Sequence, residues 1–164
     1  MDKVTETRIN LLHPQIRDEV KSLIEQANKV ISPNLTIRVV QGLRTIEEQN
    51  ELYAQGRTKH GKIVTNAKGG SSYHNYGLAI DFAFLVDGKE ISWDTSKDWD
   101  NDKIADWLEV VKIFVKAGYT WGGDFKSIKD FPHLEKKFGF TWQQLLEKHN
   151  KKDYIVGTKY VNLK

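Results

Sequence analysis

Apolar residues along the chain follow helical spacing in some stretches and strand spacing in others. They recur every three to four positions in residues 14–29 and again in residues 104–116, which predicts two amphipathic helices. Capping-box patterns at residues 45–48 (Thr-Ile-Glu-Glu) and 141–144 (Thr-Trp-Gln-Gln) predict two further helix starts. The sequence therefore predicts four helices spread over the whole length of the chain.

Strand signals lie between these helices. Residues 35–40 are β-branched, and residues 78–86 alternate strongly before an Asp-Gly hairpin turn at 87–88. Shorter strands are predicted up to about Trp93, at residues 119–121 and around His133. Because there is no strict βαβ alternation and the clearest strand pair is a hairpin, we expect one α+β domain with a small antiparallel sheet flanked by helices.

Two segments stand apart from the predicted elements. Residues 57–72 combine basic residues with glycines and serines, and they are expected to form a long, mobile loop of the kind that often carries function. Residues 151–164 are basic. The predicted organisation is a domain over residues 1–150 followed by a C-terminal tail over residues 151–164.

Composition narrows the candidate chemistry. The chain of 164 residues lacks cysteine, so a metal site must use histidines and carboxylates. The net charge of +3 is too small to indicate nucleic-acid binding. No apolar run is long enough to cross a membrane, and the polar N-terminus does not resemble a signal peptide. Synthesis in a cytoplasm is therefore expected.

The strand at residues 78–86 carries a single carboxylate. Alternate residues from Leu78 to Val86 form an apolar face, and Asp81 lies between Ala79 and Ala83 on the other face. A lone buried carboxylate costs several kcal/mol unless it is paired or bound to a metal. Considered alone, Asp81 is explained better as a solvent-facing strand residue.

Two histidines change that interpretation. His74 lies seven positions before Asp81, and Gly77 allows a tight turn that aims it at the start of the strand. His133 ends an Asp-Phe-Pro-His turn that begins at Asp130. Two histidines and one carboxylate, with a fourth position open to water, form a known catalytic zinc set, and a neighbouring acid can accept a proton from that water. A surface histidine and a turn aspartate are the ordinary alternatives.

Three motifs resemble one peptidase family. Residues 72–81 match the S-x-H-x-x-G-x-A-x-D motif of the VanY-like, or LAS, zinc metallopeptidases. Residues 130–133 (Asp-x-x-His) resemble its second motif. Residues 42–45 (Gly-Leu-Arg-Thr), with Gln49, resemble its upstream G-x-R-[ST]…Q segment. All three occur in the order of the family, and the resemblance spans roughly residues 12–140, which implies an LAS/hedgehog-like zinc peptidase fold.

Within that family the chain is most similar to the L-alanyl-D-glutamate endopeptidases of phage endolysins and bacillus-type wall hydrolases. The segments 53–57 (Tyr-Ala-Gln-Gly-Arg) and 121–125 (Trp-Gly-Gly-Asp-Phe) carry this likeness. One difference is Asp130, where some members have glutamate. The resemblance implies zinc ligands His74, Asp81 and His133, a general base Asp130, an oxyanion-stabilising Arg44, and substrate contacts from Ser72 and Gln49.

The implied activity is zinc-dependent hydrolysis of the L-Ala–D-Glu bond in the peptidoglycan stem peptide. A monomeric phage endolysin is expected, made in the host bacterial cytoplasm and reaching the wall through a holin-type partner. Two alternatives remain open at this point, a D-Ala-D-Ala carboxypeptidase and a non-catalytic zinc-containing binding module. Cobalt or manganese could fill the same ligand set.

Overall fold

The structure, a computed structural model, describes all residues 1–164. Its helices are α1 (Lys3–Asn10), α2 (Arg17–Val30), α3 (Ile46–Ala54), α4 (Asp106–Lys116) and α5 (Trp142–Asn150), with 3-10 turns η1 (Tyr73–Tyr76) and η2 (Gly122–Asp124). Its strands are β1 (Leu35–Gln41), β2 (Ala79–Val86), β3 (Glu90–Ser92), β4 (Thr120–Trp121) and β5 (His133–Glu135).

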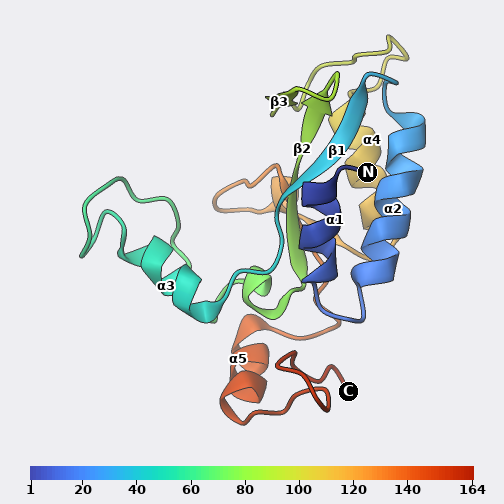
Figure 1. Cartoon of the computed structure of the whole chain (residues 1–164). Coiled ribbons are helices and arrows are strands. Elements are labelled where there is room, and N and C mark those ends of the chain that lie inside the picture. Colours follow the sequence, from blue (N-terminus) through green and yellow to red (C-terminus); the bar gives the residue numbers. More distant parts are fainter.

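One sheet organises the domain. Strand β2 pairs with β1 along one edge, while β3 and β5 pair with different parts of its other edge and β4 extends the sheet from β5. All pairings are antiparallel, so the predicted α+β class is confirmed. Figure 1 shows α1, α2 and α4 gathered on one side of the sheet, while α3 and its following loop project away from it. No helix has both the length and the apolar character needed to span a bilayer.

The core lies between β2 and the helical layer. Alternate residues of this strand point into it, and Leu78, Ile80, Phe82 and Phe84 are all buried. The Phe82 ring stacks on Trp107 of α4 with centroids 4.3 Å apart, which joins the sheet to the helices. The predicted apolar face of this strand is therefore confirmed.

Two helices begin later than their apolar spacing predicts. Helix α2 starts at Arg17 instead of residue 14, because residues 13–16 form a turn closed by the Ile16 amide and the His13 carbonyl. Helix α4 starts at Asp106 instead of residue 104. Both capping boxes occur as predicted, at the starts of α3 and α5.

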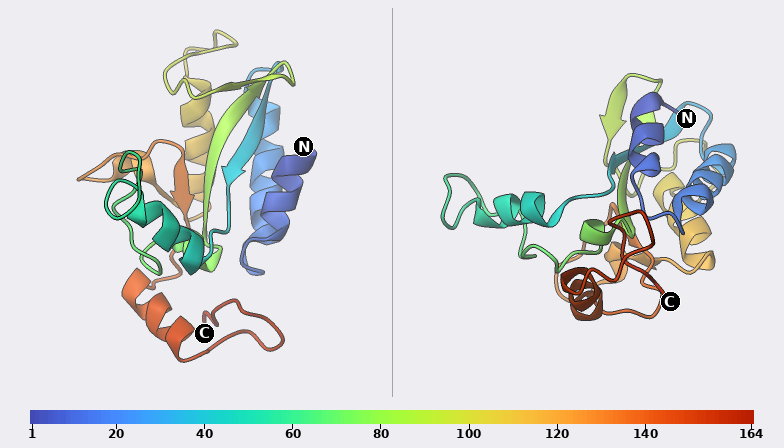
Figure 2. Two further views of the ribbon diagram at one scale, coloured as in Figure 1. Left: turned by 60° about the vertical axis from the view of Figure 1, so that its left-hand side comes forward. Right: turned by 60° about the horizontal axis from the view of Figure 1, so that its bottom comes forward.

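The predicted tail is wrong, because residues 151–164 pack onto the domain. Val161 is only 1% exposed and belongs to the hydrophobic core. The buried His13 imidazole bonds through Nε2 to the Val161 carbonyl oxygen at 2.8 Å, and the Tyr160 hydroxyl donates to the Leu11 carbonyl at 2.7 Å. The segment thus returns to the connection between α1 and α2 (Figure 2), and no domain boundary exists at residue 150.

Glu109 of α4 gives the fold a pH dependence. Burial and the nearby carboxylates of Asp102 and Asp106 raise the pKa of Glu109 to about 7. The folded protein therefore disfavours the ionised carboxylate, so stability falls as pH rises from about 4.5 to about 7 and stays lower above it. We expect Glu109→Gln to raise the free energy of unfolding by about 1 kcal/mol at pH 8, since solvent screening reduces the full cost.

Thermal or urea unfolding at several pH values, without added divalent cations, tests this. The gain from Glu109→Gln should shrink toward zero below about pH 4.5, where the glutamate is protonated in both states. An equal gain at both ends of the range would mean that packing, not ionisation, distinguishes the two side chains.

Candidate metal and catalytic site

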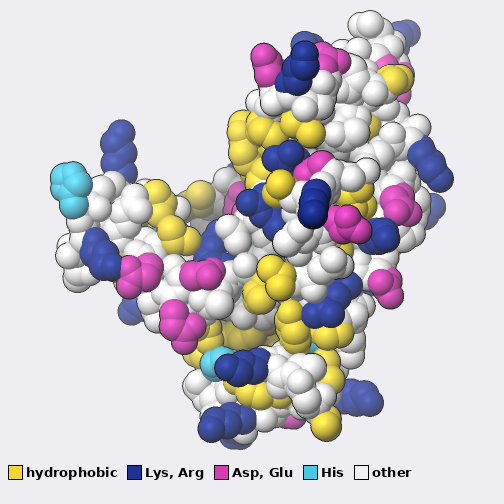
Figure 3. Space-filling view, viewed as in Figure 1, with side chains coloured by type: hydrophobic (Ala, Val, Ile, Leu, Met, Phe, Trp, Pro, Cys, Tyr) yellow, Lys and Arg dark blue, Asp and Glu magenta, His cyan; other side chains and the backbone are white.

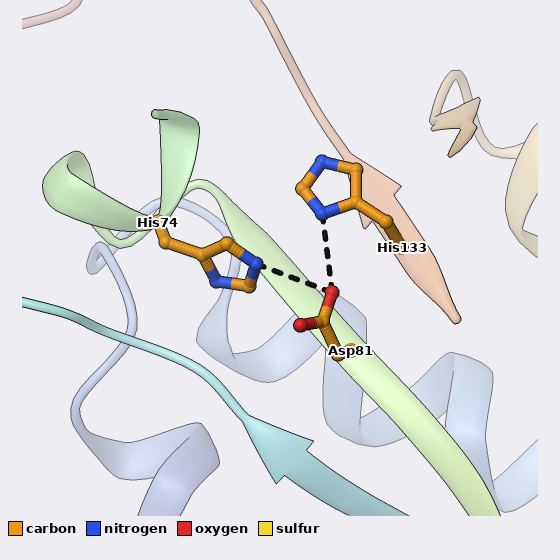
Figure 4. A group of neighbouring side chains, drawn as sticks. All are labelled: His74, Asp81 and His133. Carbon is orange, nitrogen blue, oxygen red and sulfur yellow. Dashed lines mark hydrogen bonds and ion pairs between the residues drawn. The ribbon is translucent and has the colours of Figure 1, made fainter. Parts of the chain in front are cut away.

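Three side chains converge at the junction of β2, β5 and η1. Asp81 and His133 are direct cross-strand partners, so their side chains share one face of the sheet. Figure 4 shows His74 reaching the same carboxylate from η1. The Asp81 Oδ1 atom lies 3.2 Å from His74 Nε2 and 3.1 Å from His133 Nδ1. The three ligand atoms lie within 4.8 Å of one another, close enough to share one metal ion.

The turn that carries His74 is fixed at both ends. The Ser72 hydroxyl accepts a hydrogen bond from the His74 amide at 3.3 Å, and Gly77 ends the turn with a left-handed φ of 69°. A β-carbon on Gly77 would lie 2.6 Å from the His13 backbone nitrogen, so another residue would be both strained and obstructed. The expected role of Gly77 in aiming His74 agrees with this geometry.

Each histidine is held through the ring nitrogen that faces away from Asp81. His74 Nδ1 lies 2.8 Å from the Gly42 carbonyl oxygen, and His133 Nε2 lies 2.7 Å from Glu135 Oε2. Both partners are acceptors, so these nitrogens carry the hydrogens. The other two ring nitrogens, His74 Nε2 and His133 Nδ1, lie on the side of Asp81 and are the ones that could bind a divalent metal such as zinc.

The charges of the site are strongly coupled. Burial acts to raise the pKa of Asp81, but the facing imidazoles of His74 and His133 hold that pKa well below its usual range. Burial acts to lower the pKa of His133, but its hydrogen bonds to Asp81 and Glu135 raise it to about 9. Burial and the negative charge of Asp81 raise the pKa of Asp130. The ionised form of Asp81 is therefore favoured, while the neighbouring Asp130 carboxyl protonates more readily than usual.

Asp130 lies beside the three ligands without joining them. Its Oδ2 is 4.0 Å from His133 Nδ1, and its side chain is half exposed. The turn around it is held by the Gly122 carbonyl, which accepts from the Asp130 amide at 2.9 Å. The indole nitrogens of Trp107 and Trp121 both donate to the Phe131 carbonyl, at 3.1 and 2.8 Å. The acid is thus presented to solvent on a fixed turn.

Arg44 is held by Gln49. The Arg44 guanidinium donates to Gln49 Oε1 at 3.0 Å, and the Gln49 amide group donates to the Ala67 carbonyl at 2.9 Å. Gln49 is completely buried, which suits a residue that positions Arg44. The predicted substrate contacts of Ser72 and Gln49 stay predictions, because Ser72 also serves as the cap of η1.

Glu135 is the site residue that the motifs did not identify. It lies two positions after His133 on β5, so both side chains share one face of that strand, and it is 5% exposed. The His-x-Glu spacing on a predicted strand was the available signal. A carboxylate that orients a metal-binding histidine is a recurrent feature of zinc sites.

Sequence comparisons place the chain among peptidases. A family profile described as D-alanyl-D-alanine carboxypeptidase, of the M15 peptidases, matches residues 65–136. The peptidoglycan L-alanyl-D-glutamate endopeptidase CwlK of Bacillus subtilis (strain 168) is 50% identical over 125 residues, which are 76% of this chain and 72% of that protein. The L-alanyl-D-glutamate peptidase of Listeria phage A118 is 32% identical over 88 residues, 51% of this chain and 29% of that protein.

Two solved structures share the fold. The L-Ala D-Glu endopeptidase ChiX of Serratia marcescens aligns with a TM-score of 0.54 and 22% identity, covering 84% of this chain and 90% of that one. The vancomycin resistance D,D-dipeptidase VanXYg, solved with a D-Ala-D-Ala phosphinate analog, aligns with a TM-score of 0.51 and 22% identity, covering 88% and 61%. The expected LAS-type fold is confirmed.

Proposed function

Because this chain belongs to the M15 peptidases, we propose that it is a zinc-dependent endopeptidase that hydrolyses the L-Ala–D-Glu bond of peptidoglycan stem peptides. The observation that carries the proposal is the convergence of two oriented imidazole nitrogens on Asp81, with Asp130 beside them. The 50% identity to a peptidoglycan L-alanyl-D-glutamate endopeptidase supports the choice of bond.

His74, Asp81 and His133 would hold the metal. Zinc supplies Lewis acidity in such sites, lowering the pKa of a bound water from ~16 to about 7 and polarising a substrate carbonyl. The chain itself supplies the proton transfers. Asp130 is free of the ligand set and has a raised pKa, so it can accept a proton from the attacking water and pass one to the leaving amine.

Arg44 completes the proposed chemistry. Gln49 fixes the direction of its guanidinium from a buried position. A fixed cation stabilises a carbonyl oxygen as that oxygen gains negative charge. We assign this role to Arg44.

A stem pentapeptide containing L-Ala–D-Glu and a terminal D-Ala-D-Ala tests the proposed function. The zinc-loaded protein should release L-alanine from the amino end and leave the D-Ala-D-Ala end intact. A chelator should stop the reaction, and added zinc should restore it. Turnover that is unaffected by thorough metal removal would contradict the zinc assignment.

A D-Ala-D-Ala carboxypeptidase is the second candidate, favoured by the description of the family profile that matches residues 65–136. A carboxypeptidase would release free D-alanine from the same pentapeptide.

The endolysin role, the holin-type partner and the monomeric state remain predictions. The relatives include both a Bacillus enzyme and a phage peptidase.

Glu135 gives a test of the metal site that needs no substrate. Alanine removes the acceptor that orients His133, so Glu135→Ala should weaken zinc binding by about 10- to 100-fold. Glu135→Gln should retain part of the affinity, because its amide oxygen can still accept the hydrogen bond. Both variants lose the 3.4 Å ion pair between Glu135 and Lys137. The difference in zinc affinity between the two variants therefore reports the hydrogen bond to His133.

Competition with a chromophoric chelator measures these affinities. Glu147→Ala is the matched control, since Glu147 is an exposed carboxylate that pairs with Lys151 away from the site. Unchanged zinc affinity in Glu135→Ala would remove Glu135 from the metal site.

A further inference from the structure

A large cavity adjoins Asp130. It has a volume of about 990 Å³ and lies between two loops, residues 63–67 after α3 and residues 125–130 after η2, with Trp142 of α5 also in its lining. The two loops come from separate parts of the chain, and in Figure 1 they extend toward each other. Since Asp130 is part of the lining, the cavity is continuous with the proposed catalytic site.

Half of the 12 residues that line the cavity are hydrophobic. Ile63 and Val64 are each 57% exposed on one wall, and Ile128 is 65% exposed on the other. Large exposed apolar side chains that cluster around a hollow are typical of binding sites. Between them lie small polar side chains, including Thr65 and Ser127, which can bond a peptide backbone.

The first wall, part of the loop over residues 57–72, is tied to α3. Arg57 donates from Nη1 to the carbonyls of Tyr53 at 2.7 Å and Thr65 at 3.0 Å, and from Nη2 to Asn66 Oδ1 at 3.1 Å. Its guanidinium lies 3.8 Å from the Tyr53 ring centroid. The planar fork of one arginine thus joins the end of the helix to two consecutive wall residues.

The second wall is held by backbone carbonyls. The Lys129 ammonium donates to the Gly123 carbonyl at 3.0 Å and to the Phe125 carbonyl at 3.4 Å. The Gly122 carbonyl accepts from the Phe125 amide as well as the Asp130 amide. Both walls are therefore held in place by contacts within the protein.

We propose that this cavity is the groove that binds the peptide stem next to the scissile bond, and that Arg57 is a positioning residue that fixes its wall. The proposal rests on the proposed function. The occupant is a short peptide with small apolar side chains such as alanine methyl groups, which suit the apolar walls. A wall that is ordered before binding does not lose conformational entropy when the peptide arrives, so binding is tighter.

Steady-state kinetics on soluble stem-peptide fragments test the role of Arg57. Arg57→Ala should raise KM by about tenfold, since two wall contacts are lost, while kcat stays within about twofold and zinc content is unchanged. Arg57→Lys should raise KM by nearly as much, because a lysine cannot bond two wall residues with a planar fork. Lys62→Ala is the matched control, removing a cation from the same loop without removing any wall contact.

Val64→Ser and Ile128→Ser test the groove without disturbing folding, because both side chains are mostly exposed. Each should raise KM several-fold, while Val156→Ser, at a position 97% exposed outside the cavity, should not. Wild-type KM in Arg57→Ala, Val64→Ser and Ile128→Ser would overturn the groove assignment. Failure of the wild-type protein to cleave any stem peptide would instead overturn the proposed function.

Discussion

Replacing Asp130 by alanine is expected to lower kcat by about 100- to 10,000-fold, the range associated with loss of a general base. Zinc content should not change, because Asp130 lies 4.0 Å from His133 Nδ1 and is not one of the three converging ligands. The unfolding temperature should change little, since the side chain is half exposed. Hydrolysis of a soluble stem peptide, metal analysis and thermal unfolding measure these three properties on the same sample.

Two further variants sharpen this result. Asp130→Asn keeps the shape of the side chain but cannot accept the proton, so it should be nearly as inactive as alanine. Asp124→Ala removes an exposed carboxylate from the same region and should retain activity. Full hydrolysis by Asp130→Ala would assign the base to another residue. A wild-type protein that binds zinc and wall fragments without cleaving them would support a binding module instead.

Zinc is expected to stabilise the fold by about 4 kcal/mol when its free concentration is a thousand times its Kd. For a domain of this size, this corresponds to a rise of roughly 10 °C in the unfolding temperature. Asp81→Ala should abolish the rise, because Asp81 Oδ1 faces both histidine nitrogens. Glu90→Ala, which changes an exposed carboxylate on β3 of the same sheet, should retain it.

The same stabilisation should depend on pH. Metal binding needs the free lone pair of His133 Nδ1, but the pKa of His133 is raised to about 9 in the metal-free protein. Below that pH, the bound proton competes with the metal, and each unit by which the pH falls should weaken the apparent zinc affinity by roughly tenfold.

The Asp81→Ala variant tests where the metal binds. Equal zinc-induced stabilisation in Asp81→Ala and the wild type would place the metal elsewhere.

Local signals predicted much of the fold. The alternation in β2 and the capping boxes of α3 and α5 depend on residues close in sequence, and the structure confirms them. Helix α1 was not predicted, because few of its residues are buried and its apolar spacing is weak. The packing of Val161 against His13 joins residues 148 positions apart, and nothing in the local composition of a basic segment reveals such a contact.

In the candidate site, too, some features were predicted from local sequence and others depend on long-range contacts. Motif spacing predicted that His74, Asp81 and His133 would meet, and the strand register explains how two of them do. The sequence places Glu135 on the same strand face as His133. Its role, however, depends on which ring nitrogen of His133 it contacts. The contacts of Gln49 and Arg57 depend on how the loop after α3 folds back, a long-range property that composition does not reveal.

We propose that a metal site at His74, Asp81 and His133 hydrolyses one bond of the cell-wall peptide. Digestion of purified peptidoglycan with the zinc-loaded protein, followed by mass spectrometry of the new amino termini, tests this proposal. New termini at D-glutamate are expected from the wild-type protein and should be absent from a parallel digest with Asp130→Ala. Release of free D-alanine without D-glutamate termini, or equal digestion by both proteins, would contradict it.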